Sequence, residues 1–260
     1  MTDDRFRFNS NTDNMAIQAY RWRVPVPRAV VVVAHGAAEH ALRYDRFARA
    51  LNAAGIEMLA PDHRGHGQSA GPEGLGDFGE GGWDALVADI GQVIGIAREA
   101  RPGVPIALLG HSMGAGASQQ FAPDGSKTID ALILSGSTAR EAPKEGEAPL
   151  PFEPNKPFEP ARTPYDWLSR DEAEVDKYIA DPMCGFETQT ARRPGVTVNL
   201  FNLADSERLR KIRGDLPVLL VAGDADPINN NLEGLHLLER RWRDAGVRQI
   251  DTLYYPNGRH

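Results

Sequence analysis

Hydrophobic residues gather in five short runs rich in β-branched side chains, and each run ends near Gly, Pro or Ser. Runs of this length and composition are typical of buried strands, which in a parallel sheet are apolar on both faces. The predicted strands are residues 29–34, 56–60, 105–109, 129–134 and 217–222. The sequence therefore predicts five buried strands that could form a parallel sheet.

Other segments surround these runs. Residues 6–8 and 16–23 alternate apolar and polar side chains, which predicts half-buried antiparallel strands. Apolar side chains spaced three and four apart predict helices that cover the sheet. These helical patterns occupy residues 44–51, 83–97, 115–122 and 232–242. The sequence thus predicts an α/β fold, with a mostly parallel central sheet that is flanked by helices and begins with an antiparallel edge.

The alternation of strands and helices breaks between Thr138 and Asp215, where nine of the 19 prolines fall. Proline cannot donate to a strand ladder, and the stretch is too acidic to form a core of its own. We interpret residues 138–215 as a cap inserted after the sixth strand, and residues 1–137 and 216–260 as the core. Within the cap, residues 171–180 predict a short helix, with Ser169 or Asp171 as its N-cap.

Composition narrows the class of protein. At 260 residues, with 41% hydrophobic residues, the chain suits one domain with an insertion. A net charge of −7 disfavours nucleic acid and anionic membrane surfaces as partners. Cys184 is the only cysteine, which excludes an internal disulfide and fits a reducing cytoplasm. Residues 1–14 are too polar for a signal peptide, and residues 29–34, the longest apolar run, are too short to span a membrane. We therefore expect a cytoplasmic protein without stable membrane insertion.

The sharpest motif is Gly110-His111-Ser112-Met113-Gly114, which lies between a predicted strand and a predicted helix. This context is typical of a nucleophile elbow, in which a serine occupies a tight, strained turn. Glycines on both sides keep side chains out of the turn. The motif predicts Ser112 as a catalytic nucleophile.

A serine hydroxyl needs a histidine base and a carboxylate that orients it, and in this arrangement both follow the serine in the chain. The strand at 217–222 leads into Asp224 and Asp226. We favour Asp226, because Pro227 holds it extended, whereas Asp224 could simply tie down the loop. Only two histidines come later. His236 lies in a helical pattern, so His260 is the predicted base.

The remaining histidines are expected to have other roles. His111 should point away from its neighbour Ser112. His63 and His66 lie in a Gly-rich loop and should form local hydrogen bonds. Because the histidines lack partners at metal-ligand spacing, no metal site is predicted.

Acyl transfer also requires donors for the oxyanion. One is the backbone N–H of Met113, directly after the nucleophile. The second should come from the loop after the strand at 29–34, which reads His35-Gly36-Ala37-Ala38-Glu39-His40. Ala37 is the predicted donor, since Gly36 allows the backbone to approach a substrate closely.

Together these motifs resemble the α/β-hydrolase family of monoacylglycerol lipases and lysophospholipases, grouped with the S33-like serine aminopeptidases. The resemblance spans nearly the whole chain. It rests on segments 35–40, 62–69, 110–114, 226–228 and 255–260, and on cap segments 165–170 and 181–186. It implies an α/β-hydrolase fold, no cofactor, and an ester of a fatty or other acyl chain as the small-molecule substrate. It also implies a cap that contacts the apolar part of the substrate. The aromatic and apolar cap residues expected to form that wall are Phe152, Phe158, Trp167, Leu168 and Phe186.

Two alternatives to an esterase remain open at this point. An aminopeptidase could use the same triad, and the acidic cap fits a free amino terminus; a non-catalytic binding protein would be the rival from another class. A dehalogenase or epoxide hydrolase is disfavoured, because it needs a carboxylate at position 112. Members of the family continue past the histidine that matches His260, so we expect the natural chain to extend further.

Overall fold

The computed structural model describes residues 4–71, 73–139, 153–187 and 203–260. In this part of the chain, eight strands form one sheet in the order β1-β2-β4-β3-β5-β6-β7-β8. The strands are β1 (Asp4–Asn9), β2 (Ala16–Trp22), β3 (Ala29–Ala34), β4 (Ile56–Pro61), β5 (Ile106–His111), β6 (Ala131–Ser135), β7 (Val218–Gly223) and β8 (Ile250–Tyr255). β1 and β2 pair antiparallel, as do β2 and β4, and the other neighbours pair parallel. The predicted sheet with its antiparallel edge is confirmed.

The apolar run of β3 lies in the middle of this sheet and pairs with β4 on one side and β5 on the other. Val30 and Val32 belong to the core on one face of the sheet, and Val31 and Val33 to the core on the opposite face. Both faces of the strand are therefore buried, which explains why its sequence is continuously hydrophobic rather than alternating.

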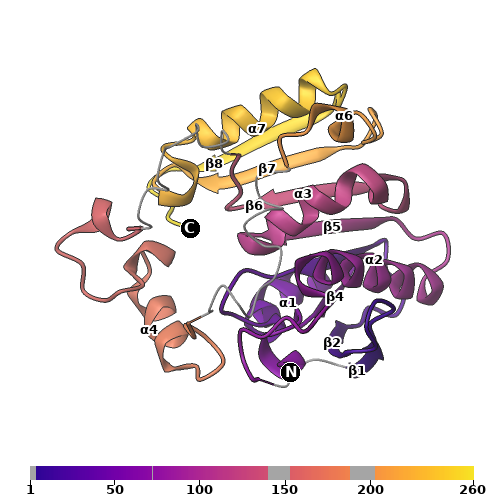
Figure 1. Cartoon of the computed structure of the whole chain (residues 1–260), viewed down its shortest axis with the longest axis horizontal. Coiled ribbons are helices and arrows are strands. Elements are labelled where there is room, and N and C mark those ends of the chain that lie inside the picture. The colour runs from indigo at the N-terminus through magenta and orange to yellow at the C-terminus, as the bar shows by residue number, and fades with distance from the viewer. Residues whose placement is uncertain (1–3, 72, 140–152, 188–202) are drawn as a thin grey trace.

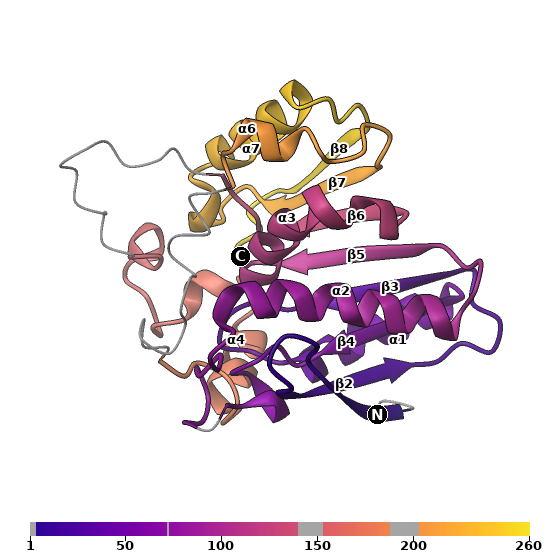
Figure 2. The same ribbon diagram turned by 45° about the vertical axis from the view of Figure 1, so that its right-hand side comes forward.

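Helices cover both faces (Figure 1, Figure 2). The larger core packs under α2 (Gly82–Ala100), α3 (Met113–Gly125) and α7 (Glu233–Asp244). The smaller core lies on the other face, under α1 (Asp45–Ala53). These helices match the segments that the three-and-four spacing predicts.

The described part of the cap lies beyond the ends toward which the parallel strands point (Figure 1, Figure 2). It contains α4 (Glu172–Ala180) and the 3-10 turns η4 (Lys156–Phe158) and η5 (Asp166–Leu168). Asp171 accepts the N–H of Ala173 at 3.1 Å, so Asp171 and not Ser169 caps the helix. The cap boundaries at 138 and 215 stay a proposal. Leu209, in α6 (Ser206–Leu209), already packs into the larger core.

Across residues 4–71, 73–139, 153–187 and 203–260, no helix combines the length and the hydrophobicity that a membrane span requires.

Candidate active site

Ser112 is the single residue between the end of β5 and the start of α3. Its φ of 53° and ψ of −117° lie outside the regions that a residue with a Cβ prefers, at a cost of about 1–3 kcal/mol. Backbone hydrogen bonds offset this cost, because its N–H donates to Ser135 at 2.9 Å and its carbonyl accepts from Ala115 at 3.0 Å. The structure thus has the strained strand-turn-helix geometry of a nucleophile elbow.

The two glycines of the motif are required by close packing. A Cβ on Gly110 would collide with the carbonyl of Gly114 and with Oγ of Ser118. A Cβ on Gly114 would collide with the carbonyl of Ala34, at the end of β3. The start of α3 therefore lies directly against the loop that follows β3.

Asp226 and His260 form a buried pair. Nδ1 of His260 lies 2.8 Å from Oδ2 of Asp226, and their side chains are 2% and 0% exposed. The second carboxylate oxygen accepts the N–H of Ile228 at 2.8 Å, which fixes the carboxylate. Asp224 instead accepts the N–H of Asn257 at 2.7 Å and ties the two loops together. Of the two aspartates weighed from the sequence, Asp226 is the one brought to His260.

The other surfaces of the His260 ring are also enclosed. The ring of Trp167 stacks on it at 5.1 Å between centroids, and the Trp167 carbonyl accepts the backbone N–H of His260 at 3.2 Å. A Cβ on Gly136, next to the residue that holds Ser112, would lie 2.8 Å from Cε1 of His260. Nε2 of His260 is buried and forms no hydrogen bond with any described residue. The nitrogen that would take the serine proton therefore has no hydrogen bond to a described residue, Ser112 included.

His111 lies beside His260, and its expected orientation away from Ser112 stays a prediction. The two ring centroids are 4.9 Å apart, and Nδ1 of His111 lies 3.3 Å from Oγ of Ser135. Burial, together with the charge of His260, lowers the pKa of His111 to about 4. This imidazole is therefore neutral near pH 7 and does not compete for the proton.

The loop after β3 passes directly beside Ser112. A Cβ on Gly36 would lie 3.2 Å from Cβ of Ser112. The Gly36 N–H donates to Oε1 of Glu39 at 2.6 Å, and the Gly36 carbonyl accepts from Nδ1 of His35 at 2.8 Å. That carbonyl belongs to the same trans peptide group as the Ala37 N–H, which must point the opposite way. The hydrogen bond from His35 to the Gly36 carbonyl thus fixes the direction in which the Ala37 N–H points.

The two predicted oxyanion donors, the N–H groups of Met113 and Ala37, share the lack of an acceptor among the described residues. Met113 is the first residue of α3, so its N–H has no intrahelical acceptor and adds to the positive end of the helix dipole. The Ala37 N–H donates to no residue among those described. Met113 adjoins Ser112 in the chain, and Ala37 follows Gly36, which passes close to Cβ of Ser112.

Glu39 is a buried carboxylate that the sequence analysis did not assign. Besides Gly36, it accepts from the hydroxyl of Tyr44 at 2.9 Å and from Arg43 at 2.6 Å. Burial alone would raise its pKa, but the charges of His111 and Arg43 outweigh burial and lower the pKa to about 2. Glu39 therefore stays ionised and holds the loop. Its position two residues after the predicted donor, within segment 35–40, was the available signal.

The histidines near this loop are only partly as expected. Nε2 of His35 accepts the backbone N–H of His63 at 2.9 Å, so the His35 proton lies on Nδ1. His66 forms the expected local contact, with Nδ1 3.0 Å from the carbonyl of Arg64. The expectation for His63 is wrong, since neither ring nitrogen bonds to a described residue. Burial lowers the pKa of His63 well below 6.5.

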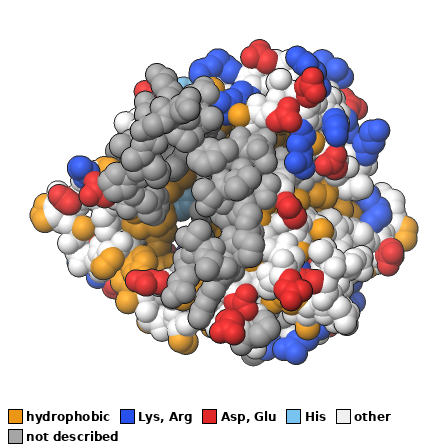
Figure 3. Space-filling view, viewed as in Figure 1, with side chains coloured by type: hydrophobic (Ala, Val, Ile, Leu, Met, Phe, Trp, Pro, Cys, Tyr) orange, Lys and Arg blue, Asp and Glu red, His pale blue; other side chains and the backbone are white. Residues whose placement is uncertain are grey.

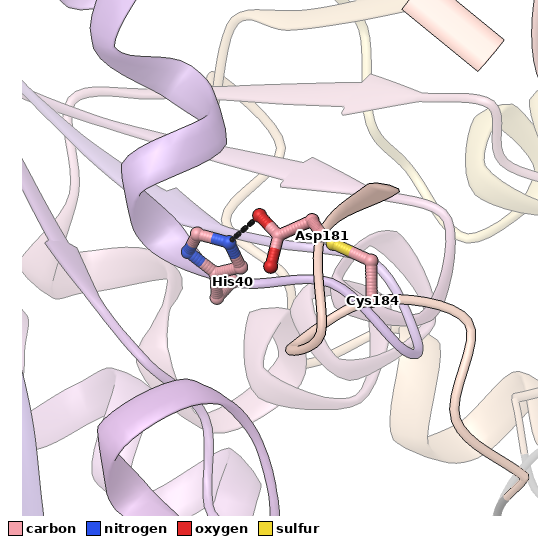
Figure 4. A group of neighbouring side chains, drawn as sticks. All are labelled: His40, Asp181 and Cys184. Atoms are coloured by element: carbon pink, nitrogen blue, oxygen red, sulfur yellow. Dashed lines mark hydrogen bonds and ion pairs between the residues drawn. The ribbon is translucent and has the colours of Figure 1, made fainter. Parts of the chain in front are cut away.

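Among the described residues, one group of side chains has the residue types and spacing of metal ligands. His40 comes from the loop after β3, and Asp181 and Cys184 from the turn after α4 (Figure 4), with one ligand atom of each within 4.8 Å of the others. However, Nε2 of His40 and Oδ2 of Asp181 lie 2.8 Å apart and satisfy each other. Burial raises the pKa of the Cys184 thiol to about 12, so it stays protonated near pH 7. The group fits a contact between cap and core better than a metal site.

The predicted cap wall is dispersed. Trp167 stacks on His260, and Phe186 packs edge-on against His66 at 5.2 Å. Phe158 lies under the guanidinium of Arg259 at 4.2 Å. Leu168 is half-buried, and Phe152 lies outside the described residues. Trp167 is the member that directly contacts the predicted triad.

Comparison with known proteins agrees with this geometry. The profile of the serine aminopeptidase S33 family matches residues 25–260. A monoacylglycerol lipase from Mycolicibacterium smegmatis is 36% identical over 77% of this chain and 71% of its own length. The monoglyceride lipase of Mus musculus is 30% identical over 94% of this chain and 81% of its own length.

The fold of the chain also resembles that of a solved esterase structure. A thermostable carboxyl esterase from Bacillus coagulans, in complex with glycerol, superposes with a TM-score of 0.85 and 27% identity. The match covers 100% of this chain and 92% of the esterase. The chain therefore belongs to the serine aminopeptidase S33 family of α/β-hydrolases and is monoglyceride lipase-like.

Proposed function

We propose that this protein hydrolyses carboxylic esters of the monoacylglycerol type through an acyl-enzyme on Ser112. The observation that carries the proposal is the buried Asp226–His260 pair, at 2.8 Å, in a chain whose Ser112 has an elbow conformation. A serine, a histidine and a carboxylate in this order form the triad that activates a hydroxyl for attack.

In the first half-reaction, Oγ of Ser112 attacks the acyl carbonyl while Nε2 of His260 takes the hydroxyl proton. Asp226 holds the imidazole through Nδ1 and stabilises the imidazolium that forms. The N–H groups of Ala37 and Met113 donate to the oxyanion of the tetrahedral intermediate. Collapse of the intermediate breaks the ester bond, and the imidazolium returns its proton to the departing alcohol.

In the second half-reaction, water replaces the alcohol. His260 takes a proton from the water as it attacks the acyl-enzyme carbonyl, and the same two N–H groups stabilise the second oxyanion. Collapse then releases the carboxylic acid and restores the Ser112 hydroxyl. This chain of steps moves protons and an acyl group only, so it requires no redox cofactor.

The cap and the relatives support an apolar acyl chain. Two relatives at 36% and 30% identity are named as lipases of monoacylglycerol or monoglyceride. Figure 3 shows a group of hydrophobic side chains on the cap side of the molecule, with charged side chains at the outer edge of the cap as well as over the core. We propose that residues 138–215 form the cap and contact the acyl chain.

An aminopeptidase is the nearest rival, because the family description includes that activity. It would need a free carboxylate near the site to bind the substrate ammonium group. Glu39 already accepts from Gly36, Tyr44 and Arg43, and Asp181 pairs with His40. These contacts favour ester hydrolysis.

The cytoplasmic location also stays a prediction, which cell fractionation would test.

One experiment separates these functions. Wild type and Ser112→Ala are assayed with p-nitrophenyl esters of graded chain length, monoacylglycerols and aminoacyl anilides. We expect ester turnover well above anilide turnover, and a loss of roughly a million-fold in Ser112→Ala. A fluorophosphonate should label Ser112 alone. Preferential anilide cleavage would support the peptidase, and label on another serine would remove Ser112 from the mechanism.

A further inference from the structure

The carbonyl of Ala38 is held by the cap. Ala38 follows the proposed oxyanion donor and has a φ of 52°, in the left-handed region that residues with a Cβ rarely adopt. Its carbonyl accepts from the Tyr178 hydroxyl at 2.9 Å and from the Gly185 N–H at 3.0 Å. Tyr178 lies on α4 and is 5% exposed, so both bonds join the cap to a loop far away in the sequence.

The ring of Tyr178 reaches the same loop by a second route. The guanidinium of Arg43 lies 4.8 Å from the ring centroid, within the range of a cation–π contact. Arg43 donates to Glu39 at 2.6 Å, and Glu39 accepts the N–H of Gly36. The hydroxyl therefore acts on the loop at Ala38, while the ring supports it through the side chains at its base.

We propose that Tyr178 is a positioning residue that keeps the Ala37 N–H aimed at the oxyanion; this inference rests on the proposed function. Ala38 holds an unfavourable backbone conformation, and the described hydrogen bonds to its carbonyl both come from the cap. Without them, Ala38 relaxes toward a common conformation and redirects the adjoining Ala37. The oxyanion site is thus complete only while the cap is seated on the core.

Tyr178→Phe tests this, because it removes one oxygen and keeps the ring on Arg43. We expect kcat for p-nitrophenyl esters to fall about tenfold, less than the loss of a whole oxyanion donor, with KM nearly unchanged. Binding of an alkylboronic acid, whose tetrahedral adduct with Ser112 places an oxygen in the oxyanion site, should weaken by a similar factor. The boronate measurement provides a readout that does not depend on turnover.

Tyr165→Phe is the matched control. The Tyr165 hydroxyl donates at 3.0 Å to the carbonyl of Gly185, inside the cap, and its ring packs on Tyr178. This variant loses the same group from the same region and should keep kcat within about twofold. Equal kcat and boronate affinity in wild type and Tyr178→Phe would overturn the positioning role. So would a raised KM with unchanged kcat, since Tyr178 would then bind substrate.

The two proposals fail in different ways. Ester turnover in wild type that is abolished in Ser112→Ala supports the proposed function, whatever Tyr178→Phe does. Absence of ester turnover in the folded wild type would overturn both. Melting temperatures of the variants show that each remains folded, and the boronate affinity of Tyr178→Phe still decides the positioning role if its turnover is too low to measure.

Discussion

Nδ1 of His35 donates to the carbonyl of Gly36 at 2.8 Å, and that carbonyl shares a peptide group with the Ala37 N–H. A hydrogen bond to the carbonyl of an amide both orients the group and polarises its N–H, which strengthens it as a donor. His35, which is completely buried, therefore acts on the proposed oxyanion site through the Gly36 carbonyl.

The first prediction follows from this contact. His35→Leu should lower kcat for esters by roughly tenfold to a hundredfold, because the Ala37 donor loses its orientation but is not removed. His35→Asn should lose less, since its amide nitrogen can occupy the place of Nδ1. Steady-state kinetics on a p-nitrophenyl ester give the comparison. Equal losses in the two variants would mean that packing, not the donated hydrogen bond, is what matters.

The second prediction separates the two aspartates after β7. Asp226→Asn should reduce kcat by about 10⁴-fold, because an amide no longer selects the correct tautomer of His260 or stabilises its cation. Asp224→Asn keeps an oxygen that can accept the Asn257 N–H and should leave kcat within about twofold. Both variants are compared with wild type at one pH. A severe loss in Asp224→Asn alone would reverse the assignment.

The third prediction concerns stability in acid. Folding lowers the pKa of His63 well below 6.5, so below that pH the unfolded chain binds a proton that the folded protein excludes. The contribution of His63 to the free energy of unfolding is therefore fully present above pH 6.5. It declines as the pH falls toward the pKa of His63 in the folded protein. His63→Leu should reduce the drop in melting temperature between about pH 7.5 and about pH 5. It should not destabilise the protein at the higher pH, because it removes two buried nitrogens that form no hydrogen bond with any described residue.

The control for that measurement is His236→Gln, a change at an exposed position on α7. Its melting temperature should drop between the two pH values as much as that of wild type. Buried His35 and His111, whose pKa values are also lowered by burial, keep part of the drop in every variant. A His63→Leu profile parallel to wild type would show that His63 does not contribute to acid sensitivity.

The fourth prediction concerns the stack of Trp167 on His260. A stacked aromatic pair contributes about 0.5–1.5 kcal/mol, which corresponds to a change in rate of roughly two- to thirteenfold. Trp167→Ala should therefore lower kcat by about that factor for short and long acyl chains alike, and Trp167→Phe should retain most of the activity. A loss confined to long chains would assign Trp167 to acyl binding alone.

Much of this structure was predictable from the sequence, because its strongest signals are local. Continuous apolar runs predicted the strands, and Gly110 and Gly114 marked the elbow because nothing larger fits beside β3 and α3. Asp226 was preferred for its extended backbone before Pro227, and it pairs with His260. The sequence signals behind these predictions come from residues that are close together in the chain.

What the sequence did not reveal depends on contacts across long separations. The bond from Tyr178 to Ala38 joins residues 140 positions apart, and no periodicity encodes it. The ring of His111 contacts His260 and Ser135, and its position depends on where β6 and the 255–260 segment meet. His63 was expected to bond locally, yet burial left its ring without partners among the described residues.

The cap contacts the core at two functionally distinct places: Trp167 on the proposed base, and Tyr178 with Gly185 on the loop beside the nucleophile. Replacing the cap with that of a related enzyme would therefore also change contacts to these two places in the core. A chimaera that imports a foreign cap for its acyl pocket must also import an aromatic ring for His260 and two donors for the Ala38 carbonyl. Libraries that vary the cap while fixing these positions should yield active variants more often than libraries that replace it whole.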